Sequence, residues 1–236
     1  MRDISEVKFN IKEGKIIGGH RMYYLLSDEL KSVDPVHFGA VFEPHNTLFL
    51  LGLLYGFHEE FTMIDIGANI GYYSSLIAAN RPKAKIYSFE PHPKVFETLQ
   101  CNAKVYPNIT PFQCGITDGE ATEATLFCDN RNLGGHSFIN SIETWGDKKG
   151  FQPEIGMYEV DSQLCNLRGF DIDFEKVKIV KIDTQGSETE ILKNIYDLLP
   201  VGTIIFVERC DGLDEFAKDK LKTIFSYEID RVFIKE

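Results

Sequence analysis

The chain has 236 residues, of which 43% are hydrophobic and 26% are charged, the composition of an ordinary globular protein. This length suits one α/β domain with a sizeable core and is too short for two comfortable ones. The net charge of −11, without any dense run of Lys or Arg, argues against a nucleic-acid partner, which would need a basic face.

The cysteines and the apolar segments indicate a cellular location. The five cysteines are irregularly spaced and form no Cys-x-x-Cys pair, so we expect reduced thiols rather than a disulfide framework or a zinc site. The amino terminus lacks the apolar core of a signal peptide. The longest apolar run, residues 48–57, is far shorter than the roughly 20 residues of a membrane span. We therefore expect a cytoplasmic protein without a membrane span.

Residues 1–60 are expected to form an amino-terminal extension that packs on a domain of residues 61–236, within one globular unit. Apolar residues on both sides of Lys12-Glu13-Gly14 predict a β-hairpin. Residues 45–57 predict a helix that Asn46 could open. The extension either lies over a ligand cleft or covers one edge of a sheet, and the sequence leaves both open.

Strand-like and helix-like segments alternate from residue 62 onwards, which predicts a doubly wound, mostly parallel, Rossmann-like α/β sheet. The predicted strands cover residues 62–66, 85–90, 109–116, 177–183, 203–207 and 227–233. The predicted helices start near Asn69 or Gly71, at Pro93, at a capping box of Ser187 and Glu190, and at Leu213, the last one reaching residue 224. A seventh strand is either absent or supplied by the amino-terminal region.

Residues 117–175 interrupt this alternation with an insertion of strands and loop after strand three. Residues 124–128 and 154–160 predict two extra strands, whereas residues 130–150 are rich in Gly and Asn and show no periodicity. Long loops of this kind are usually functional or disordered. We interpret residues 130–150 as a lid over a binding site.

The most informative segment covers residues 64–71, Ile-Asp-Ile-Gly-Ala-Asn-Ile-Gly. Its apolar start is typical of a strand and its glycines of a turn. The helix that follows leaves free N–H groups and a positive dipole end, which favour a ligand. Glu90 follows the next predicted strand, where a carboxylate can hold two ribose hydroxyls. Together these features predict a site for an adenosine-containing cofactor.

The spacing of the glycines indicates which cofactor binds. Gly67 and Gly71 are four residues apart with Asn69 between them, so the third glycine of a dinucleotide fingerprint is missing. Asn tolerates the left-handed backbone that such a turn needs. Asp65 would repel a pyrophosphate, but a carboxylate suits the ammonium and sulfonium groups of S-adenosylmethionine. We therefore predict an S-adenosylmethionine site.

Each part of this cofactor has predicted contacts. Asp65 is assigned to the methionine part, Glu90 to the ribose, and Gly115 with Ile116 to the adenine. The full predicted cofactor-binding set is Asp65, Gly67, Ala68, Asn69, Gly71, Glu90, Pro91, Gly115 and Ile116.

Residues from about 60 to 210 resemble the FkbM-type S-adenosylmethionine-dependent methyltransferases. The resemblance rests on residues 64–71, on Phe89-Glu90-Pro91, on residues 181–188 (Lys-Ile-Asp-Thr-Gln-Gly-Ser-Glu) and on the strand that ends Val207-Glu208. The first two pieces are shared by many methyltransferases, and the third is specific to this family. The resemblance implies methylation of a hydroxyl group on a sugar, a glycan or a secondary metabolite.

Transfer of a methyl group to a hydroxyl needs aligned reactants and removal of a proton. Asp183, at the end of strand four, is our first candidate for the base or for the carboxylate that orients the acceptor, because crowded carboxylates can have raised pKa values. Glu188 is either catalytic or a brace, and His136, in the lid of the acceptor site, is an alternative base. No Asp-x-Asp or Asp-Asp cluster lies at these strand ends, so we expect no catalytic metal.

The sequence leaves other functions open. They are a methyltransferase of protein or of another small molecule, an NAD-dependent oxidoreductase, and a module that binds S-adenosylmethionine without turnover. The expected partner is a small-molecule or glycan acceptor, without nucleic acid. Formation of a homo-oligomer also stays open.

Overall fold

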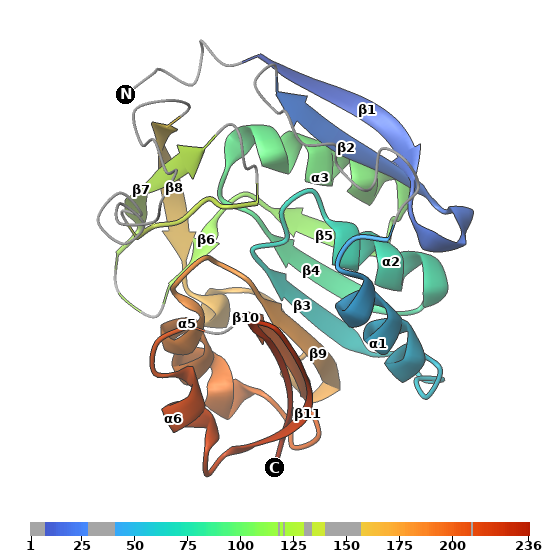
Figure 1. Ribbon diagram of the computed structural model, residues 1–236, viewed down its shortest axis with the longest axis vertical. Helices are drawn as coiled ribbons and strands as arrows, with labels where there is room; N and C mark the ends of the chain where they lie inside the picture. The colour runs from blue at the N-terminus through green and yellow to red at the C-terminus, as the bar shows by residue number, and fades with distance from the viewer. Residues whose placement is uncertain are drawn as a thin grey trace.

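The computed structural model describes residues 8–27, 41–117, 119, 121–129, 134–139, 157–208 and 210–236. Over these residues the main sheet has seven strands in the order β11-β12-β10-β9-β3-β4-β5 (Figure 1). Its strands are β3 (Thr62–Ile66), β4 (Lys85–Phe89), β5 (Ile109–Phe112), β9 (Val177–Ile182), β10 (Ile204–Glu208), β11 (Leu221–Tyr227) and β12 (Asp230–Lys235). The first five run parallel, whereas β12 is antiparallel to both of its neighbours. The predicted α/β fold class is therefore confirmed.

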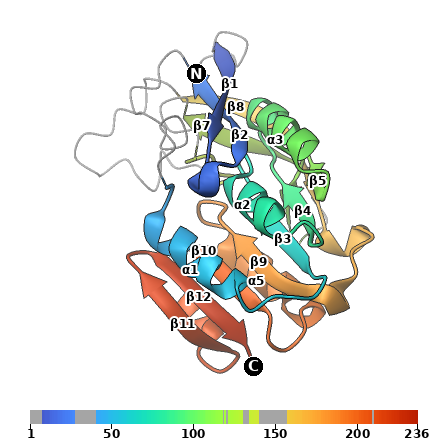
Figure 2. The ribbon, with the colours of Figure 1, turned by 90° about the vertical axis from the view of Figure 1, so that its right-hand side faces the viewer.

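Helices cover both faces of this sheet (Figure 2). The α-helices are α1 (Pro44–Leu54), α2 (Tyr72–Asn80), α3 (Pro93–Val105), α5 (Glu188–Ile195) and α6 (Leu213–Ala217), and the short 3-10 helices are η2 (Ile17–Gly19), η4 (Leu167–Gly169), η5 (Phe174–Lys176) and η6 (Tyr196–Leu198). Successive strand residues face opposite sides. Met63 and Ile179 join the core under α1 and α2, whereas Ile64 and Val180 join the core under α5 and α6. No helix in the described part of the chain is long and apolar enough to cross a membrane.

The amino-terminal segment forms a hairpin of β1 (Phe9–Lys15) and β2 (Arg21–Ser27) beside α2 and α3 (Figure 2). The predicted turn at residues 12–14 is wrong because those residues pair within the hairpin. The chain turns instead where Gly18 and Gly19 adopt φ of 84° and 77°, which favour glycine. Met22 is fully buried in the core that α1 and α2 share, so the hairpin is anchored to the main sheet.

The predicted third strand, residues 109–116, is divided between two sheets. β5 ends at Phe112, and β6 (Gly115–Ile116) pairs with β8 (Met157–Cys165) in a second sheet of order β6-β8-β7, with β7 (Glu123–Asp129) antiparallel to β8. Strands β7 and β8 correspond to the two extra strands predicted at residues 124–128 and 154–160. Of the predicted lid, residues 130–150, only residues 134–139 lie within the described part of the chain.

The carboxyl-terminal prediction of a helix over residues 213–224 is wrong. Helix α6 ends at Ala217, and β11 and β12 form a hairpin whose second strand lies between β11 and β10. Thr223, Phe225 and Tyr227 are β-branched or aromatic and favour a strand once they pair with β12. The seventh strand is therefore present and comes from this hairpin, so both expectations, that it is absent and that the amino-terminal region supplies it, are wrong.

Gly67 allows the loops after β3 and β9 to touch. Its φ is +71°, and a Cβ there would lie 1.8 Å from the Asp183 carbonyl oxygen. We expect Gly67→Ala to lower the free energy of unfolding by roughly 2–5 kcal/mol, because left-handed strain costs roughly 1–2 kcal/mol and overpacking roughly 1–3 kcal/mol more. Gly202→Ala is the control, since Gly202 has a φ of +86° but nothing within 4 Å. Equal losses in urea unfolding of the two variants would contradict the close contact.

Candidate functional site

Parallel strands bring their carboxyl ends to one edge of the sheet, where ligands bind in folds of this kind. A cavity of about 610 Å³ opens at this edge. The predicted site residues that line it are Gly67, Ala68, Asn69, Glu90, Pro91, Gly115, Ile116, His136 and Asp183. The other three predicted residues, Asp65, Gly71 and Glu188, are absent from its lining.

Glu90 is buried at the tip of β4, with 5% of its surface exposed. One carboxylate oxygen accepts a hydrogen bond from the backbone N–H of Asn69 and the other from that of His92, each at 2.9 Å. Asn69 adopts the predicted left-handed backbone, with φ of 53°. Burial raises the pKa of Glu90 to about 7, although the two hydrogen bonds oppose it. The carboxylate is thus fixed in place while each oxygen keeps a free lone pair.

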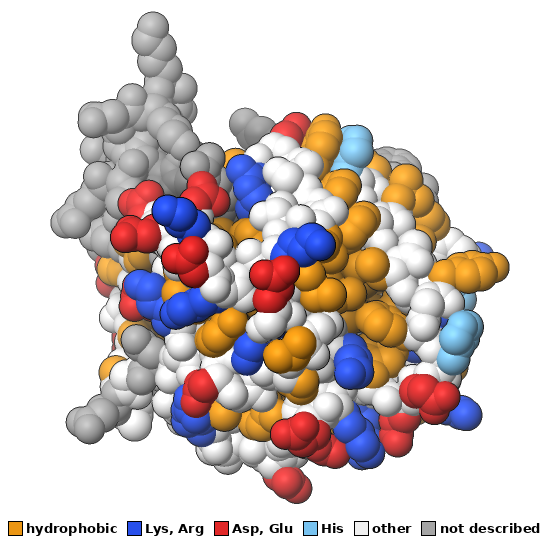
Figure 3. Space-filling view, turned by 90° about the horizontal axis from the view of Figure 1, so that it is seen from below, with side chains coloured by type: hydrophobic (Ala, Val, Ile, Leu, Met, Phe, Trp, Pro, Cys, Tyr) orange, Lys and Arg blue, Asp and Glu red, His pale blue; other side chains and the backbone are white. Residues whose placement is uncertain are grey.

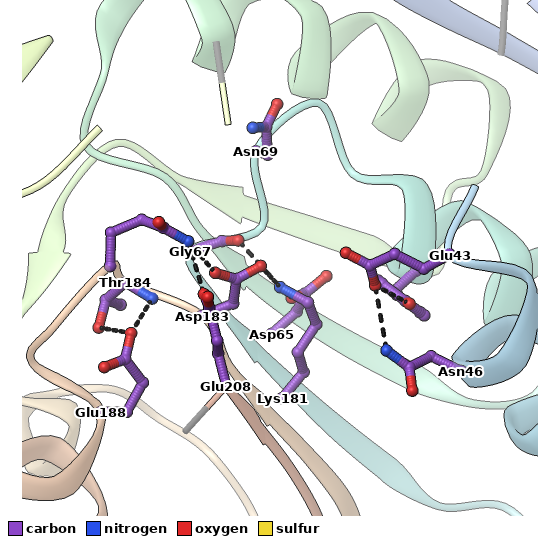
Figure 4. Close-up of polar contacts among 12 residues, drawn as sticks. Glu43, Asn46, Asp65, Gly67, Asn69, Lys181, Asp183, Thr184, Glu188 and Glu208 are labelled. Carbon is purple, nitrogen blue, oxygen red and sulfur yellow. Dashed lines mark hydrogen bonds and ion pairs between the residues drawn. The ribbon is translucent and has the colours of Figure 1, made fainter. Parts of the chain in front are cut away.

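Asp65 lies behind the cavity, fully buried, and pairs with Lys181 across β3 and β9 (Figure 4). The two residues are opposite each other in the sheet, and Lys181 Nζ lies 3.7 Å from Asp65 Oδ1. The other oxygen of Asp65 accepts a hydrogen bond of 2.5 Å from Ser74 on α2. The sequence assigned Asp65 to direct contact with the cofactor. The geometry instead gives it the role of a buried counter-ion for Lys181.

Lys181 extends from Asp65 to the cavity, where it contacts Asp183 Oδ2 at 3.2 Å (Figure 4). The raised pKa expected for Asp183 from crowding is wrong. Burial alone would raise it, but Lys181 and a hydrogen bond of 2.9 Å from Gln185 Nε2 hold the pKa of Asp183 below its ordinary value. Gln185 Nε2 also donates to Glu208 at 2.6 Å. Burial and the charge of Asp183 raise the pKa of Glu208 to about 8. Near neutral pH the pair therefore holds one proton, with Asp183 ionised.

Glu188 braces the loop between β9 and α5. Its carboxylate accepts hydrogen bonds from the backbone N–H groups of Thr184, at 2.7 Å, and of Gly186, at 2.9 Å. The predicted capping box is wrong, because the Ser187 side chain makes no capping hydrogen bond. Of the two roles that the sequence left open for Glu188, these contacts favour bracing.

Gly71 is a second predicted residue whose role is structural. It precedes α2 with φ of 82°, and a Cβ there would lie 2.6 Å from the Leu99 side chain of α3. The glycine therefore allows α2 and α3 to approach each other. The predicted start of this helix near Asn69 or Gly71 agrees with the observed one at Tyr72.

Part of the cavity lining is apolar. Pro91, Ile116 and Phe138 form this part beside Glu90, as a flat adenine ring would require. Gly115 must be a glycine here, because a Cβ would lie 2.5 Å from the Phe138 ring. Pro91, Gly115 and Ile116 thus line the same cavity as Glu90, and their contacts with an adenine stay a prediction.

Residues 134–139 cross from this apolar side to the Asp183 loop. The His136 ring stacks on that of His92, with centroids 4.5 Å apart, and Ser137 Oγ donates to the Gln185 carbonyl oxygen at 2.8 Å. Burial lowers the pKa of His136 to about 4. An imidazole that stacks on a second histidine ring in this way is held in place by its neighbours, so these contacts favour a structural role for His136 over the catalytic one.

Two clusters of described residues could offer three ligands each to a metal ion, with ligand atoms within 4.8 Å. In the first, of His92, Cys128 and His136, His92 Nδ1 accepts from Val95 N–H at 3.2 Å and Nε2 contacts the Tyr158 hydroxyl at 2.7 Å. Both ring nitrogens of His92 are therefore engaged.

The second cluster is Asp183, Glu188 and Glu208. The Glu188 carboxylate holds the loop, and Gln185 bridges the other two carboxylates. Either cluster would lose hydrogen bonds on binding a metal, so neither geometry is that of a prepared metal site.

Lys181, Glu43 and Asp230 are among the site residues that were not predicted. Lys181 lies in residues 181–188, the segment specific to the family, but the sequence indicated only a strand residue at this position. Glu43, just before α1, and Asp230, at the start of β12, line the cavity from opposite ends of the chain. The φ of Glu43 is +41°, unusual for a residue other than glycine. Only the tertiary structure brings Glu43 and Asp230 to the strand ends, so local sequence gave no signal for them.

Relatives of the chain are found among curated proteins. It is similar to methyltransferase 1 of Beauveria bassiana, with 25% identity over 70% of this chain and 70% of the relative. Methyltransferase sdnD of Sordaria araneosa is 26% identical over 56% of this chain and 60% of the relative. The hexuronic acid methyltransferase AglP of Haloferax volcanii is 26% identical over 66% and 59%. The chain thus spans less than two thirds of the last two relatives.

Two solved structures are similar in outline. They are the precorrin-6y C5,15-methyltransferase of Geobacter metallireducens (14% identity, TM-score 0.43, covering 88% of this chain and 93% of that one) and TYW2 of M. jannaschii in complex with AdoMet (12%, 0.48, 97% and 88%). The model of the methyltransferase FkbM domain matches residues 65–233, well over half of the chain. The chain therefore belongs to the FkbM family of S-adenosylmethionine-dependent methyltransferases.

Proposed function

We propose that the chain is an O-methyltransferase that transfers the methyl group of S-adenosylmethionine to a hydroxyl of a sugar, a glycan or a secondary metabolite. One observation carries the proposal: Glu90 and Asp183 line the same cavity from strands that have only β3 between them. Two strand spacings amount to roughly 10 Å. A cofactor whose ribose binds Glu90 therefore extends over Gly67 and brings its sulfonium end towards Asp183.

The residues present fit this cofactor. A volume of about 610 Å³ is within the usual range of small-molecule sites. Glu90 offers ribose hydroxyls two oxygens that are already oriented by backbone N–H groups. The apolar side next to it suits the adenine, and the carboxylates at the other end suit a positively charged group. Each part of the cavity thus has a matching part of the cofactor.

The chemical step then depends on Asp183. The cofactor, when bound, supplies a methyl group activated by a sulfonium. Asp183 is ionised near neutral pH, so its carboxylate can accept a hydrogen bond from the acceptor hydroxyl and take up its proton. Lys181 holds this carboxylate in position. Alignment can lower the barrier by roughly 7–11 kcal/mol, whereas a general base contributes typically 10²–10⁴-fold, so positioning is the larger effect.

The face of the molecule drawn in Figure 3 agrees with an acceptor other than nucleic acid. On the face seen from below, Lys and Arg are scattered among Asp and Glu and form no continuous basic patch (Figure 3). A nucleic-acid methyltransferase would need such a patch to neutralise phosphates. An enzyme is distinguished from a module that binds S-adenosylmethionine without turnover by incubation with a panel of acceptors. Only the enzyme forms S-adenosylhomocysteine.

The ribose contact is tested by Glu90→Gln. This change keeps the shape but replaces one acceptor oxygen by an amide nitrogen, which removes one charge-assisted hydrogen bond worth on the order of 1.5–3 kcal/mol. We expect S-adenosylhomocysteine to bind about 10- to 150-fold more weakly in calorimetry. Glu97→Gln is the control, because Glu97 is an exposed carboxylate on α3 that pairs only with Lys94 among the described residues. Equal affinities in the two variants would contradict the ribose assignment.

The chemical step is tested by Asp183→Asn. We expect the affinity for S-adenosylhomocysteine, which has no sulfonium charge, to stay within about threefold of the original while kcat falls roughly 10²–10⁴-fold, since the variant keeps the shape and loses the proton acceptor. Single-turnover formation of S-adenosylhomocysteine measures this. His136→Ala is the companion variant. If His136→Ala lowers kcat and Asp183→Asn does not, His136 is the base. If neither variant lowers kcat, alignment alone carries the reaction.

A further inference from the structure

The cavity is strongly acidic at the end where the acceptor would enter. Carboxylates from separate segments line it there: Glu43 before α1, Asp183 after β9, Glu208 on β10, and Glu228 and Asp230 at the β11–β12 turn. Among the described residues, Lys181 is the only Lys or Arg in its lining. Glu208 holds a proton near neutral pH, and Arg231 lies next to Glu228 and Asp230, whose backbone carbonyl oxygens accept hydrogen bonds from it. The other four carboxylates still outnumber Lys181 and Arg231, so this end has an excess of negative charge.

Asn46 on α1 gives an independent sign that a hydrogen-bond donor is missing next to this end. It is 5% exposed, and its Nδ2 donates to Asp230 Oδ2 at 2.6 Å and to Glu43 Oε2 at 3.4 Å. The reverse amide orientation would place its oxygen against two carboxylates, so the orientation is fixed. Asn46 Oδ1 is then buried without a partner among the described residues, in the lining of an adjoining cavity of about 30 Å³.

The hydrogen-bond donors near these groups are already committed. The Tyr73 hydroxyl donates to Glu43, and Lys181 lies between Asp65 and Asp183. Burial, above all, raises the pKa of Glu43 and of Asp230, and the charge of Asp183 adds to both effects. A cation that entered here would relieve this crowding and gain Coulomb energy from several carboxylates at once.

We propose that this end of the cavity is a cation-selective subsite. It takes the sulfonium of S-adenosylmethionine and, beside it, a protonated amino group of the acceptor. The subsite rests on the proposed function, because only a ribose held at Glu90 sends the sulfonium towards Asp183. The thioether of S-adenosylhomocysteine has lost that charge, so the reaction product binds more weakly than the reactant cofactor and leaves.

The negative charge at this end of the cavity also favours some acceptors over others. The relative from Haloferax volcanii is named for a hexuronic acid, whose carboxylate is an anion near neutral pH. In this chain Glu43, Glu228 and Asp230 would repel such a group and attract an ammonium. An amino-bearing hydroxyl compound is therefore the acceptor class that fits this cavity, and a uronic acid is the class that does not.

The test is calorimetry of the full chain with S-adenosylmethionine, S-adenosylhomocysteine and sinefungin, an analogue with a protonated amine near the sulfonium position. We expect the two cationic ligands to bind roughly 3- to 10-fold more tightly than S-adenosylhomocysteine at low salt, with a smaller ratio at high salt. Asp230→Asn should reduce the ratio. Asp219→Asn, which removes an exposed carboxylate outside the cavity lining, should leave it unchanged.

Equal or tighter binding of S-adenosylhomocysteine, or the same ratio in Asp230→Asn and Asp219→Asn, would overturn the subsite while leaving the proposed function intact. Failure of all three ligands to bind would remove the proposed function and the subsite together. In turnover assays with matched hexosamine and hexuronic acid acceptors, faster methylation of the hexosamine supports the acceptor class, and faster methylation of the hexuronic acid overturns it.

Discussion

The site depends on one buried ammonium group. Lys181 lies between Asp65, which is fully buried, and Asp183, which lines the cavity. Burial alone would lower the pKa of Lys181, but Asp183, Asp65 and Glu43 raise it overall, so it remains a cation. Removing one member of such a set typically lowers the free energy of unfolding by roughly 3–5 kcal/mol, because a buried charge then loses its partner. The ion cluster of Asp65, Lys181 and Asp183 thus stabilises the centre of the sheet and also fixes the position of the Asp183 carboxylate.

The fold supplies this cluster through strand register. Asp65 and Lys181 are opposite each other in the parallel pair β3–β9, and both face α2, where Ser74 takes the second oxygen of Asp65. Gly67 then lets the two strand-end loops touch, which places Asp183 beside the cofactor turn. Because β3 and β9 are the central strands of the sheet, the cluster lies where the structure has least freedom to shift.

Short sequence motifs predicted those parts of the site that depend on residues close to one another in the chain. The left-handed Asn69, the helix that starts at Pro93 and the carboxylate of Glu90 at a strand tip all follow from neighbouring residues. The counter-ion role of Asp65 did not, because it depends on the register between two distant strands. Glu43 and Asp230 could not be predicted either, since their approach to the cavity depends on tertiary packing of both ends of the chain.

The central claim is that Lys181 keeps Asp183 ionised at the cavity. Titration of the aspartate carboxyl ¹³C resonances by NMR tests it most directly, with the Asp183 signal assigned as the one missing in Asp183→Asn. Asp183 is expected to titrate below the ordinary value of 3.8. Titration at or above that value in the folded protein would show that burial outweighs the ammonium, and would contradict the account.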